Sequence, residues 1–188
     1  MRRLVLLPCI ALLVGMPVQA DVATRSADGL GTRINGALGG RCSSGVCHID
    51  GGTRSGSNRF HRLSEFDTRG AIEGVSINSH GVRNLVLGVT AADGSFINKA
   101  VSLTSPAHLF LLSPGGIQLM PGASFQQIPQ LTLSTASQLH FAGGVFDVFN
   151  TPHHAISALA GDPLPGSLGL LPGSLGEKRP LIRMDGVS

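Results

Sequence analysis

The sequence predicts an all-β protein, and two patterns carry that prediction. Short stretches in which apolar and polar residues alternate recur between residues 30 and 149, as expected for strands that turn one face inward. Clusters of Gly, Pro, Asn, Asp and Ser separate these stretches and mark tight turns. The 26 glycines and the low share of charged residues, 13%, also fit a turn-rich β protein better than a helical one.

The predicted strands centre on six alternating triplets. These triplets are residues 75–77, 101–103, 117–119, 131–133, 139–141 and 146–148. The range 81–90 also fits a helical face, because four of its apolar residues recur at helical spacing. Gly88 and the β-branched residues of this range favour a strand instead.

Residues 107–125 show most directly why a helix is excluded. Two apolar runs in this range are each closed by Pro-Gly, at Pro114 and at Pro121. Proline lacks the amide donor and clashes with the preceding turn of a helix, so the stretch is predicted to form short strands and corners. Short strands favour a parallel β-helix, in which each coil stacks on the next, over a β-sandwich, whose longer strands carry a two-layer core.

The first 20 residues are predicted to be a signal peptide. Arg2 and Arg3 precede a mostly apolar run over 4–18, and Val18-Gln19-Ala20 places small residues at the usual cleavage spacing. As a helix, this run would be roughly 22 Å long. A hydrocarbon core is about 30 Å thick, so export is favoured over a retained anchor, and the mature chain is not expected to span a membrane.

The charge balance of the mature chain argues against nucleic acid as a partner. Without Arg2 and Arg3, 12 of the 14 basic residues remain against 11 acidic ones, a net charge of +1. A nucleic-acid-binding surface would need a basic stripe, which this balance does not supply. With no Trp and no Tyr, stacking platforms for sugars would have to come from the eight Phe.

The carboxyl-terminal residues 162–188 differ in composition from the range 21–161, which we take as the folded domain. Residues 164–170 read LPGSLGL and residues 171–177 read LPGSLGE. This repeat is too short and too rich in Pro and Gly to bury a core, so 162–188 is predicted to be a linker or frayed end. The alternative is a pair of small turns whose leucines pack on the domain.

Four motifs, in order along 30–149, resemble a known family. They comprise Gly51-Gly52-Thr53 with Gly56, Asn58-Arg59-Phe60-His61 and Phe66; Val82-Arg83-Asn84-Leu85 with Gly88-Val89-Thr90; Ser95-Phe96-Ile97-Asn98; and Ala107-His108-Leu109-Phe110-Leu111-Leu112 with Ser113-Pro114-Gly115-Gly116-Ile117. Together they resemble the two-partner secretion, or haemagglutination-activity, domains of filamentous haemagglutinin-like exoproteins.

This resemblance implies a fold, a location and a partner. The expected fold is a right-handed parallel β-helix with an amino-terminal cap. The expected function is a non-enzymatic secretion and folding module of an adhesin-like exoprotein, exported through the periplasm of a Gram-negative-type envelope to the cell surface or medium. The expected partner is an outer-membrane barrel transporter with periplasmic docking domains, and a host or surface ligand is a further expected partner.

The chain departs from the family pattern in two respects. The family has Asn-Pro-Asn-Gly-Ile where this chain has Ser113-Pro114-Gly115-Gly116-Ile117. Gly115 is expected to keep the turn while losing the bonds of an Asn side chain. The family's domains also continue well beyond this length, so a fragment, a decayed gene and a short exoprotein are all open interpretations.

The motif residues are the predicted recognition site. Asn58, Phe60, His61 and Phe66 are expected to be read by the transporter in the unfolded chain, and Asn84 and the residues 113–117 belong to the same motif set. A structural role competes with this interpretation, in which both Phe side chains fill the first coils and Asn58 caps a turn. The two roles are compatible.

Cys42 and Cys47 are the cysteines left after removal of the signal peptide. In an oxidising compartment they are predicted to form a disulfide, whose small ring is worth about 2 kcal/mol of loop-closure entropy. Free thiols and a metal site with His48 are the alternatives.

No catalytic residue, cofactor or metal is predicted. His140, His153 and His154 are not expected to converge on an ion, because neighbouring side chains in an extended segment point apart. A cluster of Arg54, Arg59, Arg62 and Arg69 with Glu65 and Asp67 is predicted to be a solvated face. The alternative functions are a stand-alone extracellular binding protein and a β-helical carbohydrate-active enzyme that uses this cluster.

Overall fold

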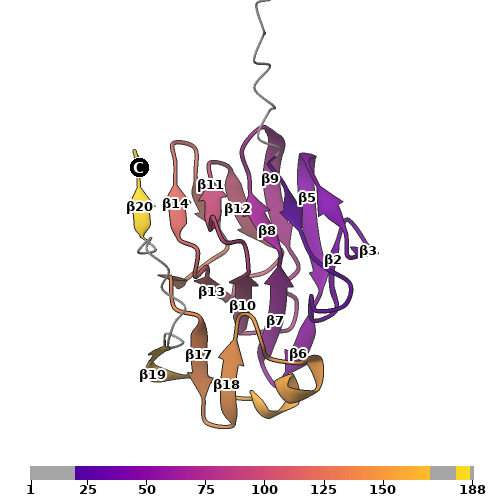
Figure 1. Ribbon diagram of the computed structural model, residues 1–188, viewed down its shortest axis with the longest axis vertical. Coiled ribbons are helices and arrows are strands. Elements are labelled where there is room, and N and C mark those ends of the chain that lie inside the picture. The colour runs from indigo at the N-terminus through magenta and orange to yellow at the C-terminus, as the bar shows by residue number, and fades with distance from the viewer. Residues whose placement is uncertain (1–19, 170–180, 187–188) are drawn as a thin grey trace, which may run out of the picture.

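The computed structural model describes residues 20–169 and 181–186, and these form a parallel β-solenoid of about four turns (Figure 1). The all-β prediction and the preference for a β-helix over a β-sandwich are therefore confirmed. The predicted signal peptide lies outside the described residues, Ala20 excepted. Within the described part of the chain, no helix has the length and apolar character needed to cross a membrane.

Each turn of the solenoid adds one strand to each of three sheets. In spatial order, sheet A contains β4 (Arg41–Cys42), β1 (Val22–Ala23), β8 (Glu65–Asp67), β11 (Ser95–Ile97), β14 (Ile117–Leu119) and β20 (Ile182–Met184). Sheet B contains β3 (Ala37–Leu38), β2 (Thr32–Ile34), β5 (Ser44–Gly51), β9 (Ala71–Ile77), β12 (Ala100–Leu103) and β15 (Ser124–Gln126). Sheet C contains β6 (Thr53–Ser55), β7 (Asn58–Leu63), β10 (Asn84–Val89), β13 (His108–Leu112) and β16 (Leu131–Ser134).

The parallel register of sheet C places equivalent residues of successive coils above one another. Asn84 in β10 pairs with Asn58 in β7 and with His108 in β13. In the same register Leu87 lies between His61 and Leu111. Successive side chains of a strand point to opposite faces, so alternate residues of these three strands form ladders inside and outside the solenoid. The range 81–90 thus contains a strand, as its Gly and β-branched residues indicated.

Antiparallel strands cover the amino-terminal end of all three sheets. β1 runs antiparallel to β4 and β8, β2 runs antiparallel to β3 and β5, and β6 runs antiparallel to β7. These reversals interrupt the parallel stacking and close the end of the solenoid. We call β1 to β4 with their loops the amino-terminal cap.

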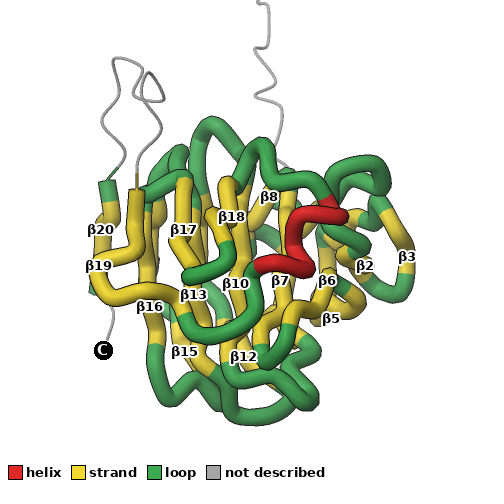
Figure 2. The backbone as a smooth tube through the Cα atoms, turned by 90° about the horizontal axis from the view of Figure 1, so that it is seen from below, coloured by secondary structure: helices red, strands yellow, loops and turns green. Residues whose placement is uncertain are grey.

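A second layer covers the outer face of sheet C (Figure 2). It is sheet D, formed by β18 (Gly144–Asp147), β17 (Gln138–Phe141) and β19 (Pro163–Gly169), together with the 3-10 helix η1 (His153–Ala158). Phe60 lies 5.5 Å from Phe141 and 5.3 Å from Phe146 between ring centroids. The described residues therefore form two hydrophobic cores, one inside the coils and one between sheets C and D.

The prediction that 162–188 is a linker or frayed end is wrong for two of its segments. Residues 163–169, which contain the first copy of the LPGSLG repeat, form β19 and pair antiparallel with β17. Residues 182–184 form β20 and pair in parallel with β14, so the chain returns to sheet A. Composition missed both strands because their partners lie far away in the sequence and supply the hydrogen bonds and cover that these segments lack alone. The second copy of the repeat lies outside the described residues.

Candidate functional site: the buried junctions of the first coil

The motif residues of the first two coils are buried in the folded domain. Asn58, Phe60 and His61 have no exposed surface, and Phe66 and Asn84 are 1% and 2% exposed. Phe66 fills the interior of the solenoid, whereas Phe60 points outward into the second core. The structural prediction thus holds for Phe66, and Phe60 instead fixes sheet D to the coils.

Two asparagines join the first coils to the carboxyl-terminal layer. The Asn58 Nδ2 group donates hydrogen bonds to the backbone oxygens of Leu159, at 2.8 Å, and Gly161, at 2.5 Å. The Asn84 Nδ2 group donates to Asn58 Oδ1 and to Asp162 Oδ1, both at 2.9 Å. The sequence suggested that Asn58 caps a turn, but its side chain does not bond its own segment. It binds a segment about 100 residues away.

The Gly-Gly-Thr motif forms the junction between the first coil and the amino-terminal cap. The Gly52 amide donates to the Gly31 oxygen at 3.1 Å, and the Thr53 hydroxyl donates to the Leu30 oxygen at 2.7 Å. A Cβ atom on Gly51 would lie 2.4 Å from the Gly31 oxygen. Only a glycine permits that approach, so this part of the motif is required for seating the cap.

His61 lies at the same junction, on the inner face of β7. Its Nδ1 atom lies 3.2 Å from the Thr32 hydroxyl oxygen, and a Cβ atom on Gly52 would lie 2.6 Å from its Cε1 atom. Its Nε2 atom is buried and has no hydrogen-bond partner among the described residues. Burial, reinforced by the positive charge of Arg59, lowers the pKa of His61 to about 3, so the imidazole is neutral at pH 7.

The prediction that the arginine cluster is a solvated face holds for Arg54, which is exposed, but is wrong for Arg59 and Arg62. Arg59 and Arg62 are 9% and 5% exposed. The Arg59 guanidinium donates to the Asn78 oxygen at 2.8 Å and the His80 oxygen at 3.3 Å. Sequence alone placed these arginines outside because Arg is seldom buried, and it could not show the carbonyl groups that the folded chain turns toward them.

Arg62 links three distant parts of the chain. Its guanidinium donates to the backbone oxygen of Asp28 in the cap at 2.9 Å. It also donates to the backbone oxygens of Asp147 and Thr151 in the carboxyl-terminal layer, at 3.1 and 2.8 Å. Arg69 by contrast is half-buried, forms an ion pair with Asp67 and lies over the ring of Phe96. These contacts give Arg59, Arg62 and Arg69 structural roles.

The corner at residues 113–117 joins β13 to β14. The Gly116 amide donates to the Ser113 oxygen at 2.9 Å, and the Ser95 hydroxyl donates to the Ser113 hydroxyl oxygen at 3.0 Å. Gly116 has a φ of 118°, whereas Gly115 is not at positive φ. Gly115 is needed because of a close contact rather than its backbone torsion angle. A Cβ atom there would lie 2.4 Å from the Ala91 backbone oxygen. Pro114 is half-buried at this corner, and Ile117 points into the core.

The structure contains the Cys42–Cys47 disulfide. It connects β4 in sheet A to β5 in sheet B, and therefore ties a strand of the cap to the first long strand of the solenoid. Both cysteines are buried. The described residues contain no group of three or more His, Cys, Asp or Glu side chains able to hold a metal ion.

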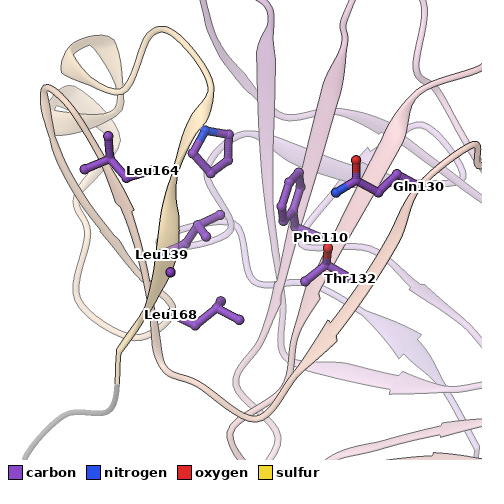
Figure 3. Close-up of a pocket in the computed structure, with 8 residues that line it drawn as sticks. Phe110, Gln130, Thr132, Leu139, Leu164 and Leu168 are labelled. Carbon is purple, nitrogen blue, oxygen red and sulfur yellow. The ribbon is translucent and has the colours of Figure 1, made fainter.

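Hollows lined by the described residues include an apolar and a more polar one. An apolar cavity of about 360 Å³ opens between sheets C and D, and Figure 3 shows Phe110, Leu139, Leu164 and Leu168 around it, with Gln130 and Thr132 on one side. A more polar groove of about 490 Å³ runs along sheet A. It includes Glu65, Asp67 and Arg69.

Sequence reasoning missed the partners of the motif residues. Leu30, Gly31, Thr32 and Asp162 complete the two junctions, and all four lie outside the quoted motifs. Thr32, between Gly31 and Arg33, gave no signal of its role, and Asp162 was assigned to the linker.

Searches against protein-family models, curated proteins and solved structures find no match to this chain.

Proposed function

We propose that this chain is a secreted, non-enzymatic secretion and folding module of an adhesin-like exoprotein, read in its unfolded state by an outer-membrane barrel transporter. The observation that supports this proposal is the burial of the motif residues. In the folded domain, Asn58, Phe60 and His61 contact segments distant in sequence and have no exposed surface. In the unfolded chain they form one accessible segment, so recognition and folding exclude each other.

The free end of the solenoid supports the folding part of the proposal. Among the described residues, β15, β16 and β20 each have a neighbouring strand on one side only. Phe125, Ile128, Leu131 and Leu133 pack against the core at this end and remain partly exposed. Folded coils offer hydrogen-bonding edges and an apolar surface to the next coil, which lowers the cost of nucleating it. Folding outside the cell would in this way draw the chain outward.

The decisive experiment compares two phenylalanines that are fully buried in the same hydrophobic core. Phe60 belongs to the motif and Phe146 does not, yet both are fully buried and their rings lie 5.3 Å apart. Urea-unfolded wild type, Phe60→Ala and Phe146→Ala are diluted onto immobilised periplasmic docking domains of a two-partner secretion transporter, and binding is measured before refolding. We expect binding to fall at least tenfold for Phe60→Ala and to stay at the wild-type level for Phe146→Ala.

Secretion of the same variants from cells that express the transporter gives the functional counterpart. Phe60→Ala should remain in the periplasm, whereas Phe146→Ala should reach the medium in a protease-sensitive form. Equal binding by all three chains, or no binding by the wild type, would contradict the proposal.

A stand-alone extracellular binding protein is the second candidate, and the cavity beside Phe110 favours it. Pockets that bind small molecules are concave and largely apolar, with a few polar groups, and this one has Gln130 and Thr132 beside its leucines. A screen of amphipathic small molecules for an increase in Tm tests this function. A hit whose effect disappears in Leu139→Ala, while the Tm of the free variant is still measurable, would favour the binding protein.

A further inference from the structure

His61 is held at the point where the amino-terminal cap meets the first coil. Three elements pack around its ring: β2 supplies the Thr32 hydroxyl, the turn between β5 and β6 supplies the Gly52 backbone, and β10 supplies Leu87 in register. Because Gly52 lies so close to Cε1, the ring is enclosed by backbone on that side. The imidazole therefore has no exposed surface and one hydrogen-bonding neighbour, at Nδ1.

No carboxylate faces this ring from the elements packed against it. Arg59, two residues before it on the same face of β7, is a cation and repels a second positive charge. Arg62 projects from the opposite face of β7 toward sheet D. Arg33 in the cap and Asp50 in β5 are register partners, and alternation turns both side chains away from the buried side that holds Thr32 and Ile49.

Protonation would therefore bury a charge without compensation. The Nδ1–H group could still donate to the Thr32 hydroxyl, but the Nε2–H group would have no acceptor among the described residues. A buried ion that lacks a counter-charge and a hydrogen-bond acceptor is far more costly than the neutral ring. The charge is accommodated when water reaches the ring, and water reaches it when the cap moves off the first coil.

We propose that the amino-terminal cap is an acid-sensitive closure of the solenoid, which stays seated on the first coil only while His61 is neutral. Acid would open the cap before it unfolds the coils, because the interior of the later coils is apolar and contains Leu87 and Leu111 where the first coil has His61. The inference concerns the folded chain and does not depend on a transporter.

The direction of the pH dependence follows from the two protonation states. Burial lowers the pKa of His61 to about 3, against an ordinary value of 6.5 in the open state. The open state thus takes up a proton that the closed state does not hold. The closed cap has its full stability above pH 6.5 and loses it as the pH falls from 6.5 toward 3, with the opening equilibrium rising about tenfold per pH unit.

Hydrogen exchange of the wild-type protein, at residue resolution, tests the proposal. The reporter amides are those of Gly52, bonded to the Gly31 oxygen, and Asn35, bonded to the His48 oxygen. Leu111 and Leu112 in β13 serve as the reference. Between pH 6 and pH 4, protection factors corrected for intrinsic exchange should fall about tenfold per unit at the reporters and stay constant at the reference.

Two variants separate His61 from the other titrating groups. His61→Gln keeps a neutral side chain beside Thr32, and its cap should lose the dependence on pH. His154→Gln changes an exposed histidine in η1 and should keep the wild-type dependence. The wild-type exchange data decide the matter even if His61→Gln fails to fold.

Constant protection at Gly52 and Asn35 down to pH 4 would overturn the proposal. An equal loss of protection in β13 would overturn it as well, because acid would then unfold the whole domain rather than the cap. Neither result bears on binding of the unfolded chain by the transporter, so the two proposals fail independently.

Discussion

Two adjacent glycines at the corner between β13 and β14 are required for different physical reasons. Gly116 adopts a φ of 118°, a region that side chains with a Cβ atom rarely enter. Gly115 does not have a positive φ, but it lies against the backbone of the previous coil, with the Ala91 oxygen 2.4 Å from where its Cβ atom would stand. The first requirement is local, and the second exists only because coils stack.

The two requirements predict costs of different size. Gly116→Ala should lower the free energy of unfolding by about 1–3 kcal/mol, the usual cost of a strained backbone conformation. Gly115→Ala should cost more, because rigid backbone atoms must move. Urea unfolding measures both, with Gly45→Ala as the control for positive φ in open space, since its φ is 66° and no atom lies near its Cβ position. A Gly115→Ala variant as stable as Gly45→Ala would contradict this account.

Sheet D is an element that depends on contacts with the first coils. Phe60 supplies its apolar contact, and Asn58 supplies the hydrogen bonds to Leu159 and Gly161. Its own strands are short, and two- or three-stranded sheets are marginal without a face to pack on. The layer is therefore held in place chiefly by the coils.

Asn58→Ala should loosen sheet D before it affects the coils. The substitution removes the side-chain donor to the buried Leu159 oxygen, and an unsatisfied buried group costs about 1–3 kcal/mol. It also removes one of the two acceptors of the Asn84 amide, which keeps its hydrogen bond to Asp162. Limited proteolysis should then cut within 142–162 faster than in the wild type, while β10 and β13 stay protected. Asn150→Ala, at an exposed position, is the matched control and should keep the wild-type rate. Unchanged proteolysis of both variants would rule out this role.

At the scale of the whole molecule, the first coil is where the two ends of the fold meet. Arg62 contacts the cap at Asp28 and the carboxyl-terminal layer at Asp147 and Thr151. These segments are 34 and more than 80 residues away in the sequence. The order of folding is constrained accordingly, because neither junction exists until the first coil has formed.

Arg62→Ala should destabilise both ends together. It removes three hydrogen bonds from a charged donor, at a cost of about 3 kcal/mol or more. Arg62→Lys should recover less than half of that loss, since a single ammonium group does not reproduce the planar fork of guanidinium. The Tm measures the loss of stability of the whole domain, and hydrogen exchange of the amides of residues 28–35 and 145–151 measures the loss of protection at each end. Arg33→Ala, at an exposed arginine bonded to the Gly36 oxygen, should change the Tm little. Wild-type stability of Arg62→Lys would contradict this account, because it would show that the positive charge of Arg62 and not its planar shape stabilises the two ends.

The strands and corners of this protein were predictable from its sequence because their causes are local. Alternation gave the six triplets, Pro114 and Pro121 excluded a helix, and Gly88 identified the strand in 81–90. Oxidising export, with Cys42 and Cys47 the cysteines left after removal of the signal peptide, predicted their pairing. Each of these features depends on neighbouring residues, so a window of a few residues contains the information.

Tertiary structure alone decided which face each residue occupies and what it touches. The sequence showed Phe60 and Phe66 as equivalent core residues, Arg59 and Arg62 as surface residues, and 163–169 as part of a linker. Stacking of the coils sent Phe60 outward to a second core, turned carbonyl oxygens toward both arginines, and gave the Pro- and Gly-rich segment a partner in β17. These outcomes depend on groups that lie 19 to 101 residues apart in the chain and meet only after folding, so no local pattern records them.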